Sequence, residues 1–289
     1  MNEERKYRVA VVGGAGVWGA RYLQGYSMHP RSEIVALVDT NRERRREFAD
    51  HYGIKQDYDT VDDLLAEDVP DIVSASVPVG VAHNVVIACA EAGVRVVSCE
   101  KPLSDELSKA DHMVSVCRER GVPFGCGTAM WEVHNLEEVC GWIREGNIGE
   151  LTEASILSGL IGQVSGTGCV PLNFLRFITG MEVEWVEGWT DPEESAGTNE
   201  DCSAYGLLGL SGGITCKIPP PSVAAPVQGN TVSLIGTDGR VWLSRGKAIL
   251  VRGTGVDALP ITPEFMTPIP EGKSNKFFKG RIESLMRSC

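Results

Sequence analysis

Three kinds of feature are scarce in this chain, and each scarcity excludes a class of protein. No apolar run approaches the ~20 residues that a membrane helix requires. Basic residues are outnumbered, and the formal net charge of −12 argues against a nucleic-acid partner and against an anionic membrane surface. The nine cysteines include no C-x-x-C pair, so neither a zinc site nor a disulfide framework is indicated.

The N-terminal segment lacks the marks of a secretory signal. It reads MNEERKYRVAVVGG, with mixed charges and no apolar stretch that ends in a small-residue cleavage site. Together with the scattered cysteines, this predicts a cytoplasmic protein with reduced thiols.

The first half of the chain alternates short apolar runs with helical segments. Expected strands are Arg8–Val12, Glu33–Asp39, Asp71–Val77, Arg95–Cys99 and Pro123–Cys126, and expected helices are Val17–Tyr26, Asn41–Tyr52, Thr60–Ala66, Val81–Ala92 and Asp105–Arg120. Asn41 and Gly53 are suitable start and stop residues for the second helix. This alternation predicts an α/β fold with a parallel sheet.

The second half has a different pattern. Helices are expected at Leu136–Glu145 and Leu172–Ile178. They are followed by short β-type runs at Val183–Trp189, Ala204–Leu210, Gly213–Ile218, Thr231–Gly236, Arg240–Ser244 and Lys247–Arg252. Pro219–Pro221 and Pro260–Pro270 are expected in loops or at sheet edges, because proline cannot donate to a central ladder. The pattern predicts a second domain with an antiparallel sheet.

One glycine-rich segment has the spacing of a dinucleotide site. It is Gly14-Ala15-Gly16-Val17-Trp18-Gly19, a G-x-G-x-x-G that follows an expected strand and opens an expected helix. Gly14 would permit the tight turn, Gly16 would let a pyrophosphate approach the backbone, and Gly19 would let helix and strand pack closely. The first helical residues, Val17 and Trp18, would offer N–H groups and a positive dipole end to the phosphates.

Asp39 ends the second expected strand, twenty residues beyond Gly19. A carboxylate there can accept hydrogen bonds from a ribose 2′-hydroxyl and would repel a 2′-phosphate, which favours NAD over NADP. Arg42 and Arg44 follow closely and could accommodate a phosphate, so NADP stays possible.

A longer pattern resembles a known family. It is Pro78-x4-His83-x8-Ala92-Gly93-x2-Val96-x3-Glu100-Lys101-Pro102. It resembles the glucose-fructose oxidoreductase / inositol dehydrogenase / rhizopine-catabolism (Gfo/Idh/MocA) family, whose most specific mark is Glu-Lys-Pro after the fifth strand. Residues 140–150 (CGWIREGNIGE), 174–180 (FLRFITG) and 234–244 (LIGTDGRVWLS) extend the resemblance over nearly the whole chain.

This resemblance implies two domains and an activity. Residues 1–125 would form an NAD(P)-binding Rossmann domain, and 126–289 an α+β domain with a large, mostly antiparallel sheet. Lys276–Cys289 resembles the start of the family's closing helices, and members commonly run some tens of residues longer. The second domain is therefore expected to be either naturally trimmed at its C-terminus or a shortened form. Such sheets often pair face to face in homodimers or homotetramers. Typical members transfer a hydride between NAD(P) and a hydroxyl-bearing carbon of a sugar, cyclitol or related polyol.

The resemblance also assigns roles to individual residues. Lys101 would lie near the nicotinamide and the reacting hydroxyl, where its charge can stabilise an alkoxide. Glu100 would orient the cofactor or the lysine, and Pro102 would fix the lysine's backbone, through a cis bond if one forms. Pro78 and His83 would lie beside the cofactor.

The sequence departs from the family at one catalytic pair. Members usually carry Asp-x-x-x-His at the head of the substrate-domain helix, but the matching positions hold Gly166 and Val170, and no histidine follows His134. A general acid or base contributes roughly 10²–10⁴-fold to a rate.

Several readings of this departure stay open. Lys101 could act alone as the base, or His134 or Glu132 could reach the pocket, and Asn173 could either bind substrate or serve as a helix cap. Trp131, Trp185 and Tyr205 are further candidates for the substrate pocket. The alternatives to a dehydrogenase are a catalytically idle dinucleotide-binding protein and a non-redox enzyme with tightly held NAD.

Overall fold

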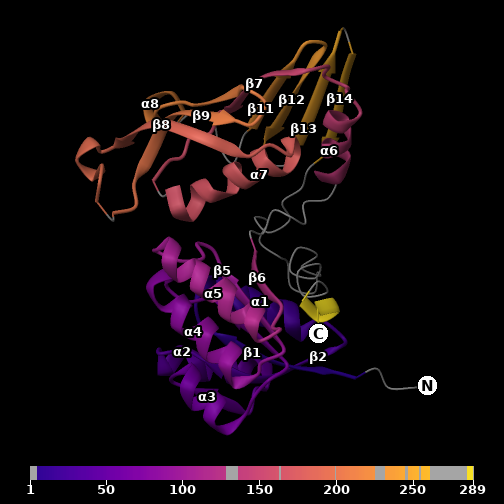
Figure 1. Cartoon of the computed structure of the whole chain (residues 1–289). Coiled ribbons are helices and arrows are strands. Elements are labelled where there is room, and N and C mark those ends of the chain that lie inside the picture. Colours follow the sequence, from indigo (N-terminus) through magenta and orange to yellow (C-terminus); the bar gives the residue numbers. More distant parts are fainter. Residues whose placement is uncertain are drawn as a thin grey trace. The chain divides into compact units, whose positions relative to one another are not determined.

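The computed structural model describes residues 5–127, 136–162, 164–198, 200–224, 232–244, 247–253, 255–260 and 285–288. The chain divides into two compact units (Figure 1). The first unit comprises Met1–Ala129 with Glu264–Cys289, and the second comprises Met130–Pro263.

The first unit alternates strands and helices. Its strands are β1 (Tyr7–Val12), β2 (Ser32–Val38), β3 (Gln56–Tyr58), β4 (Ile72–Ala75), β5 (Val96–Glu100) and β6 (Phe124–Gly127). Its helices are α1 (Val17–Ser27), α2 (Arg42–Tyr52), α3 (Val61–Glu67), α4 (Val79–Ala92) and α5 (Leu107–Glu119). The strands form one parallel sheet in the order β3-β2-β1-β4-β5-β6, which is the doubly wound order of a Rossmann fold.

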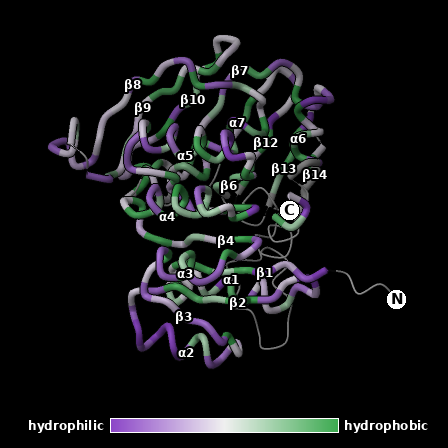
Figure 2. The backbone as a smooth tube through the Cα atoms, turned by 60° about the horizontal axis from the view of Figure 1, so that its bottom comes forward, coloured by the Kyte–Doolittle hydropathy of each residue, from purple (hydrophilic) through white to green (hydrophobic). Residues whose placement is uncertain are grey.

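This parallel sheet is buried on both faces. Val9 and Val11 of β1 belong to one apolar cluster, whereas Ala10 and Val12 belong to another. Successive side chains of a strand point to opposite faces, so helices must cover both sides of the sheet. Figure 2 shows that the buried strands and the solvated helices differ in hydropathy, since β4 is coloured as hydrophobic and helix α2 as hydrophilic.

The ends of two helices follow local sequence signals. The Asn41 side chain accepts a hydrogen bond from the Arg44 N–H, and Gly53 closes the same helix in the left-handed conformation, with φ of 66°. Thr60 caps α3 by accepting from the Asp63 N–H. These caps place the residues that follow β2 and β3 at the carboxyl edge of the sheet.

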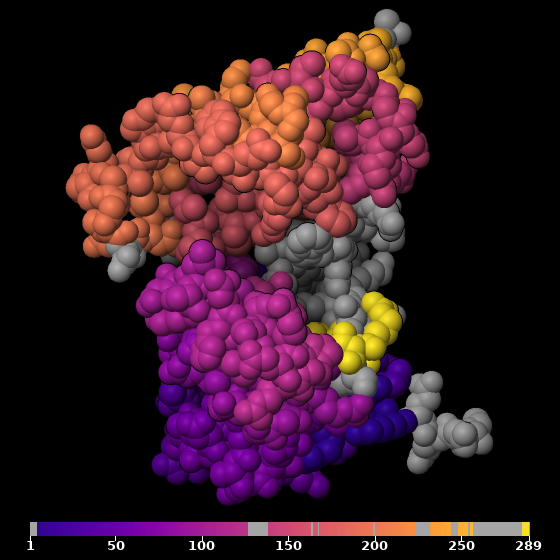
Figure 3. Space-filling view, viewed as in Figure 1, coloured from indigo at the N-terminus to yellow at the C-terminus, as the bar shows by residue number. Residues whose placement is uncertain are grey.

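The C-terminal helical turn belongs to the first unit. It is the yellow segment in Figure 3. Leu285 and Met286 of this turn are buried in the cluster that contains Val9, Tyr22 and Leu37. The prediction assigned these two residues to the second domain, but their apolar side chains pack against the first sheet instead.

The second unit is built around a sheet that is mostly antiparallel. Its helices are α6 (Leu136–Arg144), α7 (Cys169–Thr179) and the short α8 (Pro221–Ala224), and a π-helical turn, η2 (Val164–Gly168), precedes α7. The strands are β7 (Leu151–Ile156), β8 (Val183–Asp191), β9 (Ser203–Leu210), β10 (Ile214–Ile218), β11 (Val232–Gly236), β12 (Gly239–Ser244), β13 (Lys247–Arg252) and β14 (Gly255–Pro260), with a 3₁₀ turn, η3 (Glu193–Ser195), after β8. Their order is β14-β13-β12-β11-β7-β10-β9-β8, and the β7–β10 pair is parallel.

One face of this second sheet packs on helices and the other carries exposed aromatic side chains. Helices α6 and α7 lie on one side of the sheet (Figure 1), and their side chains share an apolar cluster with Ala154, Leu234 and Val241. The opposite face, which we call the open face, carries Trp185, Trp189, Tyr205, Trp242 and Val256, as the strand registers require. Trp189 stacks on Tyr205 with ring centroids 5.9 Å apart and remains 51% exposed.

None of the helices in the described ranges has the length and apolar character needed to cross a membrane.

Candidate functional site

The glycine loop joins β1 to α1 and permits several close backbone approaches. Gly13 has a φ of +74°, so it supplies the left-handed turn that the prediction assigned to Gly14. A Cβ on Gly14 would meet Leu37 Cδ1 at 2.2 Å, and a Cβ on Gly19 would meet the Gly13 carbonyl oxygen at 2.1 Å. Tight packing against β2 and against the loop therefore explains these two glycines.

Helix α1 begins directly after this loop. Gly16 is its N-cap residue and provides no side chain to cap the first turn. Val17 and Trp18 form the start of the helix and are exposed. The first turn of an eleven-residue helix thus presents backbone N–H groups and a positive dipole end beside the glycine loop, which is a favourable place for a pyrophosphate.

Asp39 connects the end of β2 to the glycine loop. Its Oδ2 accepts a hydrogen bond from the Ala15 N–H at 3.0 Å, and its Oδ1 accepts from the Asn41 N–H at 2.9 Å. Each carboxylate oxygen has a further lone pair, so both can also accept a hydrogen bond from a ribose hydroxyl.

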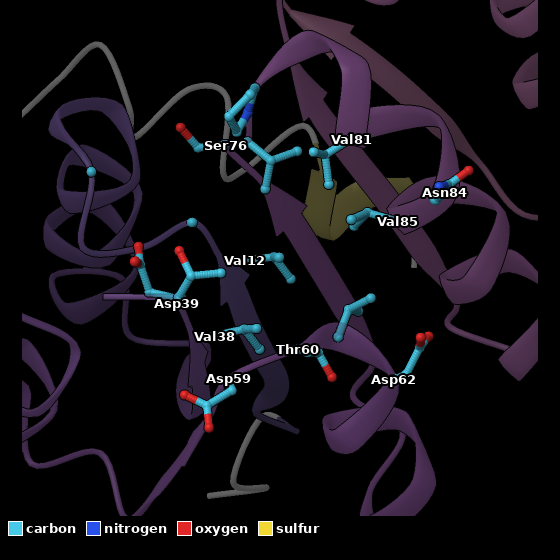
Figure 4. A pocket seen from close by; sticks show the side chains of 16 residues that line it. Val12, Val38, Asp39, Asp59, Thr60, Asp62, Ser76, Val81, Asn84 and Val85 are labelled. Carbon is cyan, nitrogen blue, oxygen red and sulfur yellow. The ribbon is translucent and has the colours of Figure 1, made fainter. Parts of the chain in front are cut away.

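A pocket of about 570 Å³ lies at this edge of the first sheet (Figure 4). The lining residues are Val12, Gly13, Gly16, Val38, Asp39, Thr40, Asp59, Thr60, Val61, Asp62, Ser76, Val77, Pro78, Val81, Asn84 and Val85. They combine an apolar floor of valines with polar groups from the loops that follow β1 to β4. This volume and this mixture are typical of sites for small organic ligands.

The structure brings the glycine loop, Asp39 and Pro78 together at this pocket, but it places His83 elsewhere. Pro78 precedes α4 and lines the cavity. His83 lies one turn further along α4, and its Nε2 is 2.9 Å from Nδ1 of His112 on α5. His83 is not among the lining residues, so its predicted contact with the cofactor stays a prediction.

Glu100 and Lys101 follow the neighbouring strand β5. Glu100 Oε1 accepts a hydrogen bond from the Tyr22 hydroxyl at 2.8 Å. The Lys101–Pro102 peptide is cis, as the sequence allowed. Lys101 begins the loop at the carboxyl end of β5, an interior strand of the first sheet. Open α/β sheets bind their ligands at this edge.

In the second unit, the two positions that the resemblance matched to the family's Asp-x-x-x-His pair are Gly166 in η2 and Val170 in α7. Val170 is buried in the core beneath the second sheet. Asn173 Nδ2 donates to the Cys169 carbonyl oxygen at 2.8 Å, so this amide group is engaged within its own helix. His134, Trp131 and Glu132 lie outside the described residues, whereas Trp185 and Tyr205 are on the open face.

Sequence reasoning missed one buried ionic group beside the pocket. Arg45 of α2 is only 4% exposed, and it donates to Asp57 at 2.5 Å, to the Asp39 carbonyl oxygen at 2.5 Å and to Asp59. Burial alone would lower the pKa of Arg45, but the hydrogen bonds to Asp57 and Asp59 outweigh that effect and raise it. In the sequence Arg45 is one of several charged residues on a solvated helix, and only the adjacent loop reveals its role.

Comparison with known proteins agrees with this geometry. Residues 7–128 match the family described as an oxidoreductase family with an NAD-binding Rossmann fold, Gfo/Idh/MocA. A D-apiose dehydrogenase of Paraburkholderia graminis is 24% identical over 258 residues, which cover 83% of this chain and 68% of the relative. A myo-inositol 2-dehydrogenase of Thermotoga maritima is 24% identical over 250 residues, covering 81% and 74%.

A solved structure extends the likeness in fold to nearly the whole chain. An oxidoreductase from Agrobacterium radiobacter, in complex with NAD+, L-tartaric acid and magnesium, superposes with a TM-score of 0.77. The match covers 98% of this chain and 87% of that structure, at 19% identity.

Proposed function

The chain belongs to the Gfo/Idh/MocA oxidoreductase family, and on that premise we propose that it is an NAD(P)-dependent dehydrogenase or reductase. It transfers a hydride between nicotinamide and a hydroxyl-bearing carbon of a sugar, cyclitol or related polyol. Relatives whose names specify D-apiose and myo-inositol dehydrogenases support this class of substrate. A cytoplasmic location belongs to the same proposal.

One observation carries the proposal. The pocket, the glycine loop and the Asp39 carboxylate meet at the carboxyl edge of the first sheet, and Lys101 leaves the same edge from β5. This arrangement fits a dinucleotide because each part of that ligand finds a matching group. The pocket would hold the adenosine half, Asp39 would accept hydrogen bonds from the ribose hydroxyls, and the N–H groups at the start of α1 would hold the pyrophosphate.

The bound nicotinamide would supply the hydride acceptor or donor, and Lys101 would donate or accept the proton. In the direction of reduction, the Lys101 ammonium donates a proton from Nζ to the carbonyl oxygen of the substrate. In the direction of oxidation, its amine accepts the hydroxyl proton as the hydride leaves the carbon. Glu100, held by Tyr22, orients this end of β5.

The test measures nicotinamide absorbance with a panel of sugars, cyclitols and polyols, in both reaction directions. Lys101→Met should lower kcat by roughly 10²–10⁴-fold because it removes the proton-transfer group. The affinity for NAD+ should stay close to that of the wild type. Lys109→Met is the matched control, since Lys109 pairs with Asp105 and Glu106 on the surface of α5.

A second candidate function has its own support. At the head of α7 the family positions hold Gly166 and Val170, and Asn173 bonds within its helix, which favours a dinucleotide-binding protein without hydride transfer. Tight NAD(H) binding together with silence across the panel would favour this candidate. Product formation without net change in nicotinamide absorbance would instead indicate a non-redox enzyme that keeps its NAD.

Self-association through the open face is the remaining part of the proposal. Trp185, Trp189 and Trp242 leave aromatic surface on one side of the second sheet. Exposed apolar patches of this kind mark interaction surfaces, and two copies of the same face can pair around a twofold axis. We infer a homodimer or homotetramer in which open faces pack together.

A further inference from the structure

The pocket at the edge of the first sheet carries several acidic side chains, although the proposed dinucleotide is itself an anion. Asp39, Asp59 and Asp62 all line the pocket (Figure 4). Asp39 was expected from the sequence as the ribose ligand, but Asp59 was not. Asp59 follows β3, the short edge strand whose residues Gln56–Tyr58 pair with β2.

Asp59 is held in place by the buried arginine. Arg45 donates to the Asp59 carboxylate and to the main-chain carbonyl of Asp39, at 2.5 Å for the second bond. The same guanidinium therefore connects the two loops that carry Asp39 and Asp59. Because its donors are fixed in a rigid fork, Arg45 also fixes where these acidic residues lie relative to each other.

The carboxylate of Asp59 is held in its ionised form by the ion pair with Arg45. Hydrogen bonding and attraction to Arg45, with a smaller contribution from Arg42, hold the pKa of Asp59 below its usual value. Arg44 stacks over the Phe48 ring, with its guanidinium carbon 5.9 Å from the ring centroid. Of the two arginines that could accept a 2′-phosphate, Arg42 is attracted to Asp59 and Arg44 lies over an aromatic ring.

We propose that Asp59 is a second cofactor-specificity residue, which acts with Asp39 to exclude the 2′-phosphate of NADP and so to select NAD. This inference rests on the proposed function, since it assumes that the pocket receives the adenosine half of a dinucleotide. The alternative is that Asp39 alone excludes NADP. The two hypotheses differ in what they predict for a variant without Asp39, because under our proposal the carboxylate of Asp59 would still repel the 2′-phosphate.

The test is isothermal titration calorimetry of the full-length protein with NAD+ and with NADP+. The quantity compared is the ratio of the two dissociation constants, Kd for NADP+ over Kd for NAD+. Asp59→Asn should lower this ratio about tenfold, the order expected for removing one Coulomb repulsion at a solvated site. Asp39→Ser with Asp59→Asn should lower it further than either change alone.

Asp57→Asn is the matched control. Asp57 bonds to the same Arg45 but does not line the pocket. The amide oxygen of an asparagine can still accept from Arg45, so this substitution removes an equal charge outside the pocket and leaves the arginine in place. The ratio should stay at the wild-type value in this variant. Asp59 is 67% exposed, so Asp59→Asn should fold, and Asp59→Ser provides a second test of the same charge.

Ionic strength gives an independent readout. The ratio of Kd for NADP+ to Kd for NAD+ should differ less between the wild type and Asp59→Asn as salt is added. Screening by salt weakens charge repulsion at exposed sites. If the wild type binds NAD+ but Asp59→Asn shifts the ratio no more than Asp57→Asn does, the inference is overturned while the proposed function stands. If the folded wild type binds neither dinucleotide, the proposed function itself fails.

Discussion

The hydroxyl of Tyr22 donates a hydrogen bond to Glu100 Oε1 at 2.8 Å, linking the helix after the glycine loop to the end of β5. Tyr22 is fully buried, and its ring stacks on that of Tyr26, with centroids 6.4 Å apart. Glu100 directly precedes Lys101. This hydrogen bond therefore connects the two parts of the proposed site, one for phosphates and one for proton transfer.

Tyr22→Phe should reduce turnover more than it reduces cofactor affinity. Loss of the hydroxyl removes a donor to the carboxylate and should cost about 1 kcal/mol of unfolding free energy. Tyr26→Phe is the matched control, because Tyr26 is equally buried but its hydroxyl bonds to Ser74 at 2.8 Å. Similar losses of stability with a lower kcat only in Tyr22→Phe would support a positioning role. Equal kcat values in the two variants would contradict it.

Gly19→Ala should destabilise the first unit and weaken dinucleotide binding. Its Cβ would lie 2.1 Å from the Gly13 carbonyl oxygen and 2.6 Å from the Gly14 Cα, so the loop or α1 must move. Overpacking of this kind costs about 1–3 kcal/mol. Urea denaturation measures that loss.

Gly80→Ala provides the comparison for Gly19→Ala. Gly80 lies in the first turn of α4, and the nearest atom to an added Cβ there is 3.9 Å away. This variant should be as stable as the wild type or up to about 1 kcal/mol more stable. Equal effects of the two substitutions would show that steric crowding does not explain Gly19.

How far the sequence predicted the structure can be seen in particular elements. Helix α2 was predicted with both of its ends, because Asn41 and Gly53 act through local backbone chemistry. The strand at Lys247–Arg252 was predicted with its observed bounds. β3, β7 and β14 were missed. β3 has only three residues and β14 ends in a proline, and each forms by pairing at a sheet edge. β7 lies inside the second sheet, but its sequence LTEASI has no continuous apolar run.

The site was predictable where it depends on motif spacing. The strand–turn–helix pattern placed Gly16 and Gly19 at the turn between β1 and α1, and Asp39 at the end of β2, and the structure has them there. Their roles toward a cofactor stay predictions. The left-handed Gly13 and the Arg45 contacts were not found. They depend on the loops after β3 and β4, which approach the glycine loop and α2 only in the folded domain.

Cys89 and Cys216 should resist alkylation in the native protein at mildly alkaline pH. Burial is the main cause that raises the pKa of each thiol from 9.0 to about 12. Exposed Cys126 should react with iodoacetamide before Cys89 and Cys216 do, and mass spectrometry of the labelled peptides reports the order. Labelling of Cys89 as fast as Cys126 would contradict the described packing of α4.

The same thiol shifts predict a loss of stability in alkali. Below pH 9.0 the thiol is protonated in both folded and unfolded chains, so this contribution is fully present. As pH rises toward about 12, the unfolded thiol ionises while the folded one does not, and the free energy of unfolding falls. Urea denaturation should show a shallower decline in Cys89→Ala than in the wild type.

Trp189→Glu should weaken self-association without changing NAD+ affinity. The substitution replaces one ring of the stacked Trp189–Tyr205 pair on the open face with a carboxylate. Burial of that charge against a second copy would cost free energy. Sedimentation velocity should show a shift toward monomer. Leu107→Glu is the control, since Leu107 is exposed on α5 in the first unit. An unchanged assembly in Trp189→Glu would place the interface elsewhere.

Calorimetric titration of NAD+ into the folded protein, compared with its Asp39→Ala variant, tests the central claim most directly. The account predicts saturable binding in the wild type. It predicts affinity at least about tenfold weaker in Asp39→Ala, because hydrogen bonds to a charged carboxylate are lost. No binding by well-folded wild-type protein, or equal binding by the two proteins, would contradict a dinucleotide site at the glycine loop and Asp39.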